Sequence, residues 1–146
     1  GEYLTATTDE KIIERIFDPR VDLAKEVVLE KNIGKTLDPM VGSAEIADYQ
    51  PNTVRVKTNS EGDNLLFLSD NYYPGWYAYV DGVKSDIYRS DYTFRSVFVP
   101  KGEHEVVFKY EPTSVKIGAL ITLTSLVTYM GWVGKNLVKR PRKSKP

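Results

Sequence analysis

Hydrophobic and polar positions follow two different periods along this chain of 146 residues. Near its start, four apolar residues recur at helical spacing: Ile12, Ile13, Ile16 and Phe17. The segment Thr7-Thr8-Asp9-Glu10 just before them has the form of a capping box with Thr7 as the N-cap, and Asp18-Pro19 ends the pattern. The pattern predicts a short amphipathic helix within an N-terminal segment, residues 1–24.

From Lys25 onward the apolar positions alternate with polar ones, which is the period of a β-strand. Short runs of this kind are bounded by Gly, Pro, Asn or Asp: EVVLE, AEIADYQ, TVRVKT, LLFLSD, GWYAYV, VKSDIY, YTFRSVFV and HEVVFKYE. Residues 33–43 contain two glycines and a proline and are predicted to form a loop. So many short strands predict an all-β domain over residues 25–113, an antiparallel β-sandwich of the jelly-roll kind.

Two tight turns fix how neighbouring strands pair. Asp81-Gly82 is typical of a two-residue type I′ hairpin, because both central residues of that turn need a positive φ. Pro100-Lys101-Gly102 predicts a second tight reversal before the last strand. Alternation within that strand predicts four residues on the face toward the core: His104, Val106, Phe108 and Tyr110.

The C-terminal part of the chain contains eighteen consecutive uncharged residues, 117–134. As a helix this run would be ~27 Å long at about 1.5 Å per residue, close to the ~30 Å of a hydrocarbon core. Tyr129 and Trp132 near its end match the aromatic belt of a membrane interface. The run predicts a transmembrane helix over residues 114–135. The alternative is a buried helix of a soluble protein, which the Thr and Ser residues in the run leave open.

The formal net charge of zero hides an uneven distribution. All 20 acidic residues lie at or before Glu111, whereas six basic residues and no acidic ones follow Gly134. By the positive-inside rule the basic tail, residues 136–146, is cytoplasmic and the β-sandwich is extracytoplasmic in the cell membrane. The tail lacks interleaved aromatic residues, so we expect no nucleic-acid partner. Because the chain opens with Gly1 and has no signal peptide, we expect it to be a piece of a longer protein with upstream membrane segments.

Few residues of the chain are suited to catalysis or metal binding. There is no cysteine, which excludes disulfides, thiolate metal sites and cysteine nucleophiles. The single histidine, His104, falls in a predicted strand, where a structural role is expected. Asn59, Glu61 and Asp63 alternate as calcium ligands do, but the rest of an EF-hand loop is missing, so we expect a solvated turn. We therefore expect no catalytic residue, no metal site and no cofactor in this chain.

The aromatic segment NYYPGWYAYVDG is the remaining candidate for a binding site. Tyr72 and Tyr73 precede Pro74-Gly75 and therefore lie on a loop, where two adjacent tyrosines are hard to explain by packing alone. Aromatic rings stack on the apolar faces of sugars, and nearby polar side chains would supply hydrogen bonds: Asp70, Asn71 and Arg95. The alternative is that both tyrosines cover the end of the sandwich or rest at the bilayer interface.

The segment YYPGWYAYVDG, together with DIYRSDYTFRSVFVPKGEHEVVFKYEPTSVKIGALITLTSL, resembles the C-terminal end of YfhO-type bacterial membrane proteins. The matching positions run in order over about residues 70–126: Tyr73, Pro74, Gly75, Trp76, Val80, Asp81, Gly82, Arg95, Val99, Pro100, Gly102, His104, Phe108, Tyr110 and Pro112. The family resembles polytopic glycosyltransferases that use lipid-linked sugars and modify cell-envelope polymers such as lipoteichoic acid. Their catalytic acid lies near the N-terminal spans, so the resemblance carries no catalytic residue over to this chain.

The resemblance implies a non-catalytic extracytoplasmic accessory domain of a cell-envelope glycosyltransferase-like membrane protein. Its partners would be the lipid bilayer, the remainder of the parent protein, and an envelope glycan or lipid-linked sugar that the domain binds or positions. A second hypothesis is a purely structural or interaction domain of a membrane-anchored surface protein. A third is a freestanding soluble enzyme, which would require the C-terminal helix to fold onto the sheet.

Overall fold

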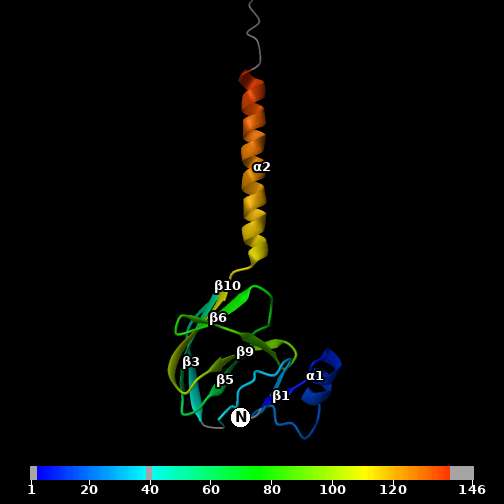
Figure 1. Cartoon of the computed structure of the whole chain (residues 1–146), viewed down its shortest axis with the longest axis vertical. Coiled ribbons are helices and arrows are strands. Elements are labelled where there is room, and N and C mark those ends of the chain that lie inside the picture. Colours follow the sequence, from blue (N-terminus) through cyan, green and yellow to red (C-terminus); the bar gives the residue numbers. More distant parts are fainter. Residues whose placement is uncertain (1–2, 39–40, 139–146) are drawn as a thin grey trace, which may run out of the picture. The chain divides into compact units, whose positions relative to one another are not determined.

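The computed structural model describes residues 3–38 and 41–138 (Figure 1). The chain divides into two units, one that ends at Glu111 and one that begins at Pro112. The first unit is a two-sheet β domain with a short helix near its N-terminus, and the second contains a single long helix. The predicted fold class, a β-sandwich with a short N-terminal helix and an apolar C-terminal helix, is thereby confirmed.

Each sheet of the sandwich has five strands. The first has the order β1 (Tyr3–Thr5), β2 (Val27–Leu29), β8 (Ile87–Ser90), β9 (Phe94–Val99) and β5 (Asn64–Leu68). The second has the order β3 (Gly42–Gln50), β4 (Thr53–Ser60), β10 (Gly102–Tyr110), β6 (Trp76–Val80) and β7 (Val83–Ser85). Neighbouring strands are antiparallel except β1 and β2, which run parallel.

The hydrophobic core fills the space between the two sheets. Its buried members come from both inner faces: Val54, Val56, Leu68, Ala78, Val97, Val99, Val106 and Phe108. Strand β10 pairs with β4 on one side and β6 on the other, so it lies at the centre of its sheet. Val106 and Phe108 are fully buried, as the alternation in this strand predicts.

The N-terminal segment packs against the β-sandwich. Helix α1 (Asp9–Ile16) buries Ile12 against Ala6 and Val28. The helix starts one residue later than the sequence suggests, because the hydroxyl of Thr8 is the N-cap that accepts from the amide of Lys11 (3.4 Å). Glu10 is then the second helical residue, so the capping box predicted with Thr7 is wrong.

One predicted strand is divided in the structure, and two predicted turns are present. The run VKSDIY, predicted as one strand, is split at Asp86 into β7 and β8, which belong to different sheets. The turn at Asp81 (φ 51°) and Gly82 (φ 80°) has two positive φ angles, which confirms the type I′ prediction. Gly102 (φ 118°) allows the second predicted reversal, where few other residues adopt the required backbone.

The C-terminal helix α2 runs from Thr113 to Val138. It therefore extends past the predicted end at residue 135 and includes the first residues of the predicted tail. The remaining tail residues, 139–146, lie outside the described residues, as do residues 39–40 of the predicted loop. Gly42 and Ser43 at the end of that loop already belong to β3.

Candidate functional site

Residues 71–75 of the aromatic segment lie in the loop between β5 and β6, and an ion pair between Asp70 and buried Arg95 holds the start of this loop. Asp70 accepts a hydrogen bond from the Arg95 guanidinium through Oδ2 (2.8 Å). The hydroxyl of Tyr49 on β3 donates to the same carboxylate (3.0 Å to Oδ1). Asp70 thus joins strand β9 of one sheet to strand β3 of the other at the base of the loop.

Arg95 lies inside the sandwich and has only 1% of its side chain exposed. Its guanidinium carbon lies 4.0 Å from the centre of the Trp76 ring and 5.2 Å from that of Phe108. Burial lowers the pKa of Arg95, and the charge of Asp70 opposes that shift. Buried in this way, Arg95 supports the loop from below, whereas the sequence suggested it as a direct hydrogen-bond donor to a ligand.

Asn71 is exposed, and its side chain also bonds to a neighbouring turn. Its side-chain oxygen accepts from the hydroxyl of Thr93 (3.2 Å), and the backbone amide of Tyr72 donates to the carbonyl of Thr93 (2.6 Å). Farther along the loop, the amide of Trp76 donates to the carbonyl of Tyr73 (3.4 Å). The two bonds to Thr93 fasten the loop to the β8–β9 turn, and the third closes the loop on itself.

Tyr72 and Tyr73 remain exposed at the surface, with 40% and 61% of their area accessible. They line one side of a hollow of about 270 Å³, together with Pro74, Gly75, Trp76, Tyr77, Lys84, Ser85, Asp86 and Ile87. Lys84 lies over the ring of Tyr77, with its ammonium 4.5 Å from the ring centre. The hollow thus combines aromatic faces with an ammonium, a hydroxyl and a carboxylate, a mixture suited to a sugar ring.

A larger hollow of about 550 Å³ lies on the outer face of the second sheet. Its charged lining residues come from β3, β4 and β10: Glu45, Lys57, Glu103 and Glu105. Among its described lining residues there is no Phe, Tyr or Trp, and His104 supplies the one ring. We favour the smaller hollow as the candidate site, because stacking surfaces and polar groups converge there in spite of its size.

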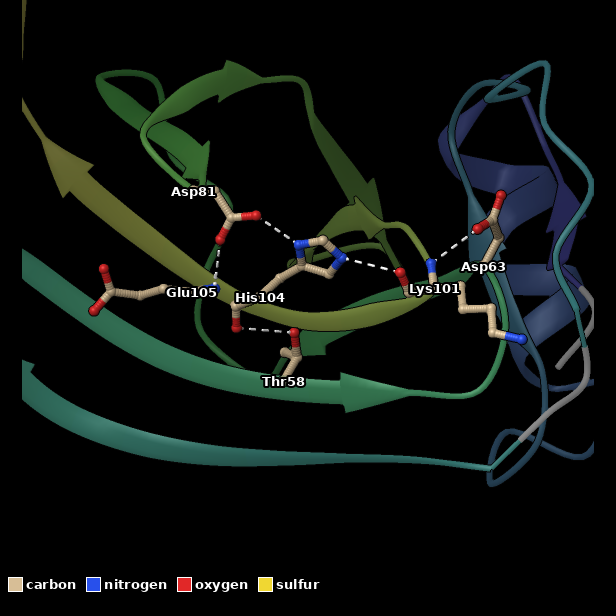
Figure 2. A network of polar contacts seen from close by, with 6 residues as sticks. All are labelled: Thr58, Asp63, Asp81, Lys101, His104 and Glu105. Atoms are coloured by element: carbon tan, nitrogen blue, oxygen red, sulfur yellow. Dashed lines mark hydrogen bonds and ion pairs between the residues drawn. The ribbon is translucent and has the colours of Figure 1, made fainter.

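His104 lies near the start of β10 and forms part of a polar network that connects two turns (Figure 2). Its Nδ1 lies 2.5 Å from Asp81 Oδ2, and its Nε2 lies 3.2 Å from the carbonyl oxygen of Lys101. The Asp81 carboxylate raises the pKa of His104, and the histidine in turn lowers the pKa of Asp81. Both ring nitrogens therefore bond to residues of two different turns, which agrees with a structural role.

The acidic segment considered for calcium has partners within the protein. Asn59 donates to Glu103 (3.2 Å), and Asp63 accepts from the backbone amide of Lys101 (3.0 Å). Within residues 3–38 and 41–138, no group of three or more His, Cys, Asp or Glu residues is arranged to hold a metal ion. Asn59 and Asp63 are thus hydrogen-bonded to residues of the β9–β10 turn and of β10.

Helix α2 has the composition of a membrane span. A stretch of 24 residues, Thr113–Asn136, is long and apolar enough to cross a bilayer, and none of it is buried. Four Thr and Ser hydroxyls in its middle suit an apolar environment, because each of them donates to a carbonyl one turn earlier: Thr122 to Gly118, Thr124 to Leu120, Ser125 to Ile121 and Thr128 to Thr124. The Thr and Ser residues therefore do not argue against a lipid environment.

Three residues of the site escaped prediction from the sequence. Tyr49 lies in an exposed edge strand, and only its spacing past a β-bulge directs its hydroxyl toward Asp70. Tyr77 and Lys84 meet because β6 and β7 pair across the Asp81-Gly82 turn. The type I′ signal could have revealed this second contact, since it fixes the register of the hairpin.

Comparison with known proteins places the chain within one family. The family described as "Bacterial membrane protein YfhO" matches residues 40–122, which is more than half of the chain. The curated protein "Uncharacterized protein YfhO" of Bacillus subtilis (strain 168) is 27% identical over 84 residues. That stretch is 58% of this chain but 10% of the relative, so the chain spans about a tenth of the relative's length. No solved structure matches the chain.

Proposed function

Because the chain belongs to the YfhO family of bacterial membrane proteins, we propose that its β-sandwich is a non-catalytic extracytoplasmic domain that binds or positions glycan. The parent protein would be a glycosyltransferase-like enzyme of the cell envelope, with its catalytic residues elsewhere in the molecule. The ligand would be an envelope glycan or a lipid-linked sugar. The β-sandwich would lie outside the cell, and the basic tail would lie in the cytoplasm.

The observation that carries this proposal is the construction of the loop between β5 and β6. Buried Arg95 and its partner Asp70 hold the loop from beneath, while Tyr72 and Tyr73 remain exposed above the hollow. A loop fixed in this way loses little conformational entropy when its rings stack on a sugar. An ion pair at the base and exposed rings at the tip are what preorganised recognition requires.

Calorimetric titration of the intact chain in nanodiscs would test glycan binding. The probe is deacylated lipoteichoic acid, which cannot insert into the bilayer by its own lipid. A lost stacking contact is worth about 0.5–1.5 kcal/mol, so Tyr72→Ala or Tyr73→Ala should weaken binding by roughly 2–10-fold. The melting temperature of each variant should stay close to that of the unsubstituted chain, because both side chains are exposed.

Phe17→Ala is the matched control for these variants. Phe17 is an exposed aromatic residue next to α1, and it takes no part in the hollow. Its replacement should leave the affinity unchanged. Equal affinities for the unsubstituted chain, Tyr72→Ala and Tyr73→Ala would refute a role for the loop in glycan binding.

One observation favours the structural alternative, in which the domain packs against the rest of its parent protein. Strand β3 is the edge of its sheet and is exposed along most of its nine residues, including Ile46. A long exposed edge strand offers free backbone groups to another chain segment. Cross-links from β3 to upstream segments of the parent, with no affinity for the glycan probe, would support this alternative.

A further inference from the structure

Aromatic residues gather at the end of the β domain from which the chain continues into α2. Tyr110 is the last residue of β10 and lies opposite Trp76, the first residue of β6. The next residue, Glu111, donates its amide to the carbonyl of Gly75 (2.7 Å). The aromatic loop is thus bonded directly to the segment through which the chain leaves the domain.

Four aromatic residues make up this end of the domain, which we term the exit rim: Tyr49, Tyr73, Trp76 and Tyr110. The ring of Tyr110 lies 5.3 Å from that of Trp76 and 6.4 Å from that of Tyr73. Tyr49 is 58% exposed and Tyr73 is the more exposed of the two loop tyrosines. The rim therefore presents tyrosine rings outward over a packed aromatic base.

The opposite end of the same sheet has a different character. At the start of β10 the chain turns at Lys101 and Glu103, next to the β4–β5 turn with Glu61 and Asp63. These turn residues are charged and none of them is aromatic. The turns at this end thus lack the aromatic rings that gather at the exit rim, a difference that core packing alone does not require.

The length of chain between the rim and the apolar helix limits how far apart they can be. Glu111 and Thr113 are two residues apart, and residues 113–117 are helical. Two extended residues and one turn of helix span about 13 Å in total. The interfacial layer on each side of a hydrocarbon core is about 5–8 Å thick. A tether of about 13 Å is long enough for the rim to reach that layer and too short to hold the rim far above it.

We propose that the exit rim contacts the headgroup layer of the bilayer through Tyr49, Tyr73 and Tyr110. Tyrosine suits this layer, because its ring meets the acyl boundary while its hydroxyl remains among polar groups. No cluster of basic residues is needed for such contact, so it does not depend on anionic lipid. The contact fixes the height of the domain above the membrane, and it stands whether or not the neighbouring hollow binds glycan.

Spin labels on strand β3 can measure this contact in the intact chain. The chain has no cysteine, so a single cysteine can be placed at Gln50, near the rim, or at Ser43, at the far end of the same strand. The two positions are about 23 Å apart at roughly 3.3 Å per residue. The chain is reconstituted in phosphatidylcholine nanodiscs, and each label is exposed to oxygen, which concentrates in lipid, and to a water-soluble nickel chelate.

The label at Gln50 should collide more with oxygen and less with nickel than the label at Ser43. Adding Tyr49→Ser and Tyr73→Ser should lower the oxygen-to-nickel ratio at Gln50 several-fold and leave Ser43 unchanged, whereas Phe17→Ser should change neither. A thermal melt of each variant confirms that the domain is folded, and Tyr73→Ser alone serves if the double variant melts early. The proposal would be overturned if both labels had the same low oxygen-to-nickel ratio, typical of water. It would also be overturned if the ratio at Gln50 did not change on the tyrosine substitutions.

Discussion

The substitution Asp70→Ala should destabilise the β domain strongly, because it leaves the buried Arg95 without its carboxylate partner. The Asp70 side chain is 29% exposed, whereas that of its partner Arg95 is 1% exposed. In Asp70→Ala, Arg95 would keep its charge among apolar groups, with Trp76 and Phe108 as its closest aromatic neighbours. Breaking a buried pair costs about 3–5 kcal/mol, and partial access of water to the Asp70 position should reduce this to about 2–4 kcal/mol.

The expected loss can be converted to a melting temperature. A domain slightly larger than 100 residues loses about 4 °C per kcal/mol, so Asp70→Ala should lower the melting temperature by roughly 8–16 °C. Trp76 reports on unfolding directly, because it lies against the Arg95 guanidinium. Its fluorescence can be isolated with Trp132→Phe, since the chain has two tryptophans. The assay is urea and thermal unfolding of the full chain in a mild detergent.

A double-mutant cycle separates the ion pair from general packing. Arg95→Met removes the buried charge and keeps much of the side-chain volume. Combined with Asp70→Ala, it should cost less than the sum of the two single changes, with a coupling of about 1.5–3 kcal/mol. Additivity within about 0.5 kcal/mol would show that the pair does not hold the loop, and the account of the site would then fail.

Three further predictions concern turns. The pKa of His104 is raised above 6.5, and the pKa of Asp81 is lowered below 3.8. The pair should therefore stabilise the domain most between about pH 4 and 6.5, and this stabilisation should decrease above and below that range. His104→Gln should remove this pH dependence from the melting temperature. Asp91 has a positive φ and accepts a hydrogen bond from the amide of Val28, and burial raises the pKa of its carboxyl group. Asparagine is neutral and tolerates a positive φ, so Asp91→Asn should raise the melting temperature at pH 7 by a few degrees. A lower melting temperature would contradict this reasoning. An alanine Cβ at position 82 would meet no neighbouring atom, but φ there is 80°. Gly82→Ala should therefore lower the free energy of unfolding in urea by about 1 kcal/mol. Gly34→Ala should have a similar effect, because Gly34 also has a positive φ.

The strand pattern could be predicted because burial of one face imposes a period of two on the sequence. Strand β1 was missed because three residues are too few to show any period, and its partner β2 is parallel to it. The division of VKSDIY into β7 and β8 was missed for another reason. The run contains no Gly or Pro, and only the three-dimensional path shows that the chain changes sheets at Asp86.

The position of Tyr72 and Tyr73 on an exposed loop followed from Pro74-Gly75, but the role of Arg95 did not. Arg95 shares a face with Val97 and Val99 in β9, and this spacing places it on the core side. A charged residue at a core position needs a partner, and the sequence alone does not say which acidic residue that is. Asp70 becomes the partner because β5 and β9 pair with Leu68 opposite Arg95.

Cysteine accessibility in intact bacteria tests most directly whether the β domain is extracytoplasmic. A membrane-impermeant maleimide is applied to cells that produce the parent protein with Val83→Cys, at an exposed position of the β domain, or with Ser144→Cys in the basic tail. Labelling of the unsubstituted parent is subtracted. The account predicts labelling at position 83 in intact cells and at position 144 only after the cells are permeabilised. The opposite pattern would place the domain in the cytoplasm and contradict the proposed function.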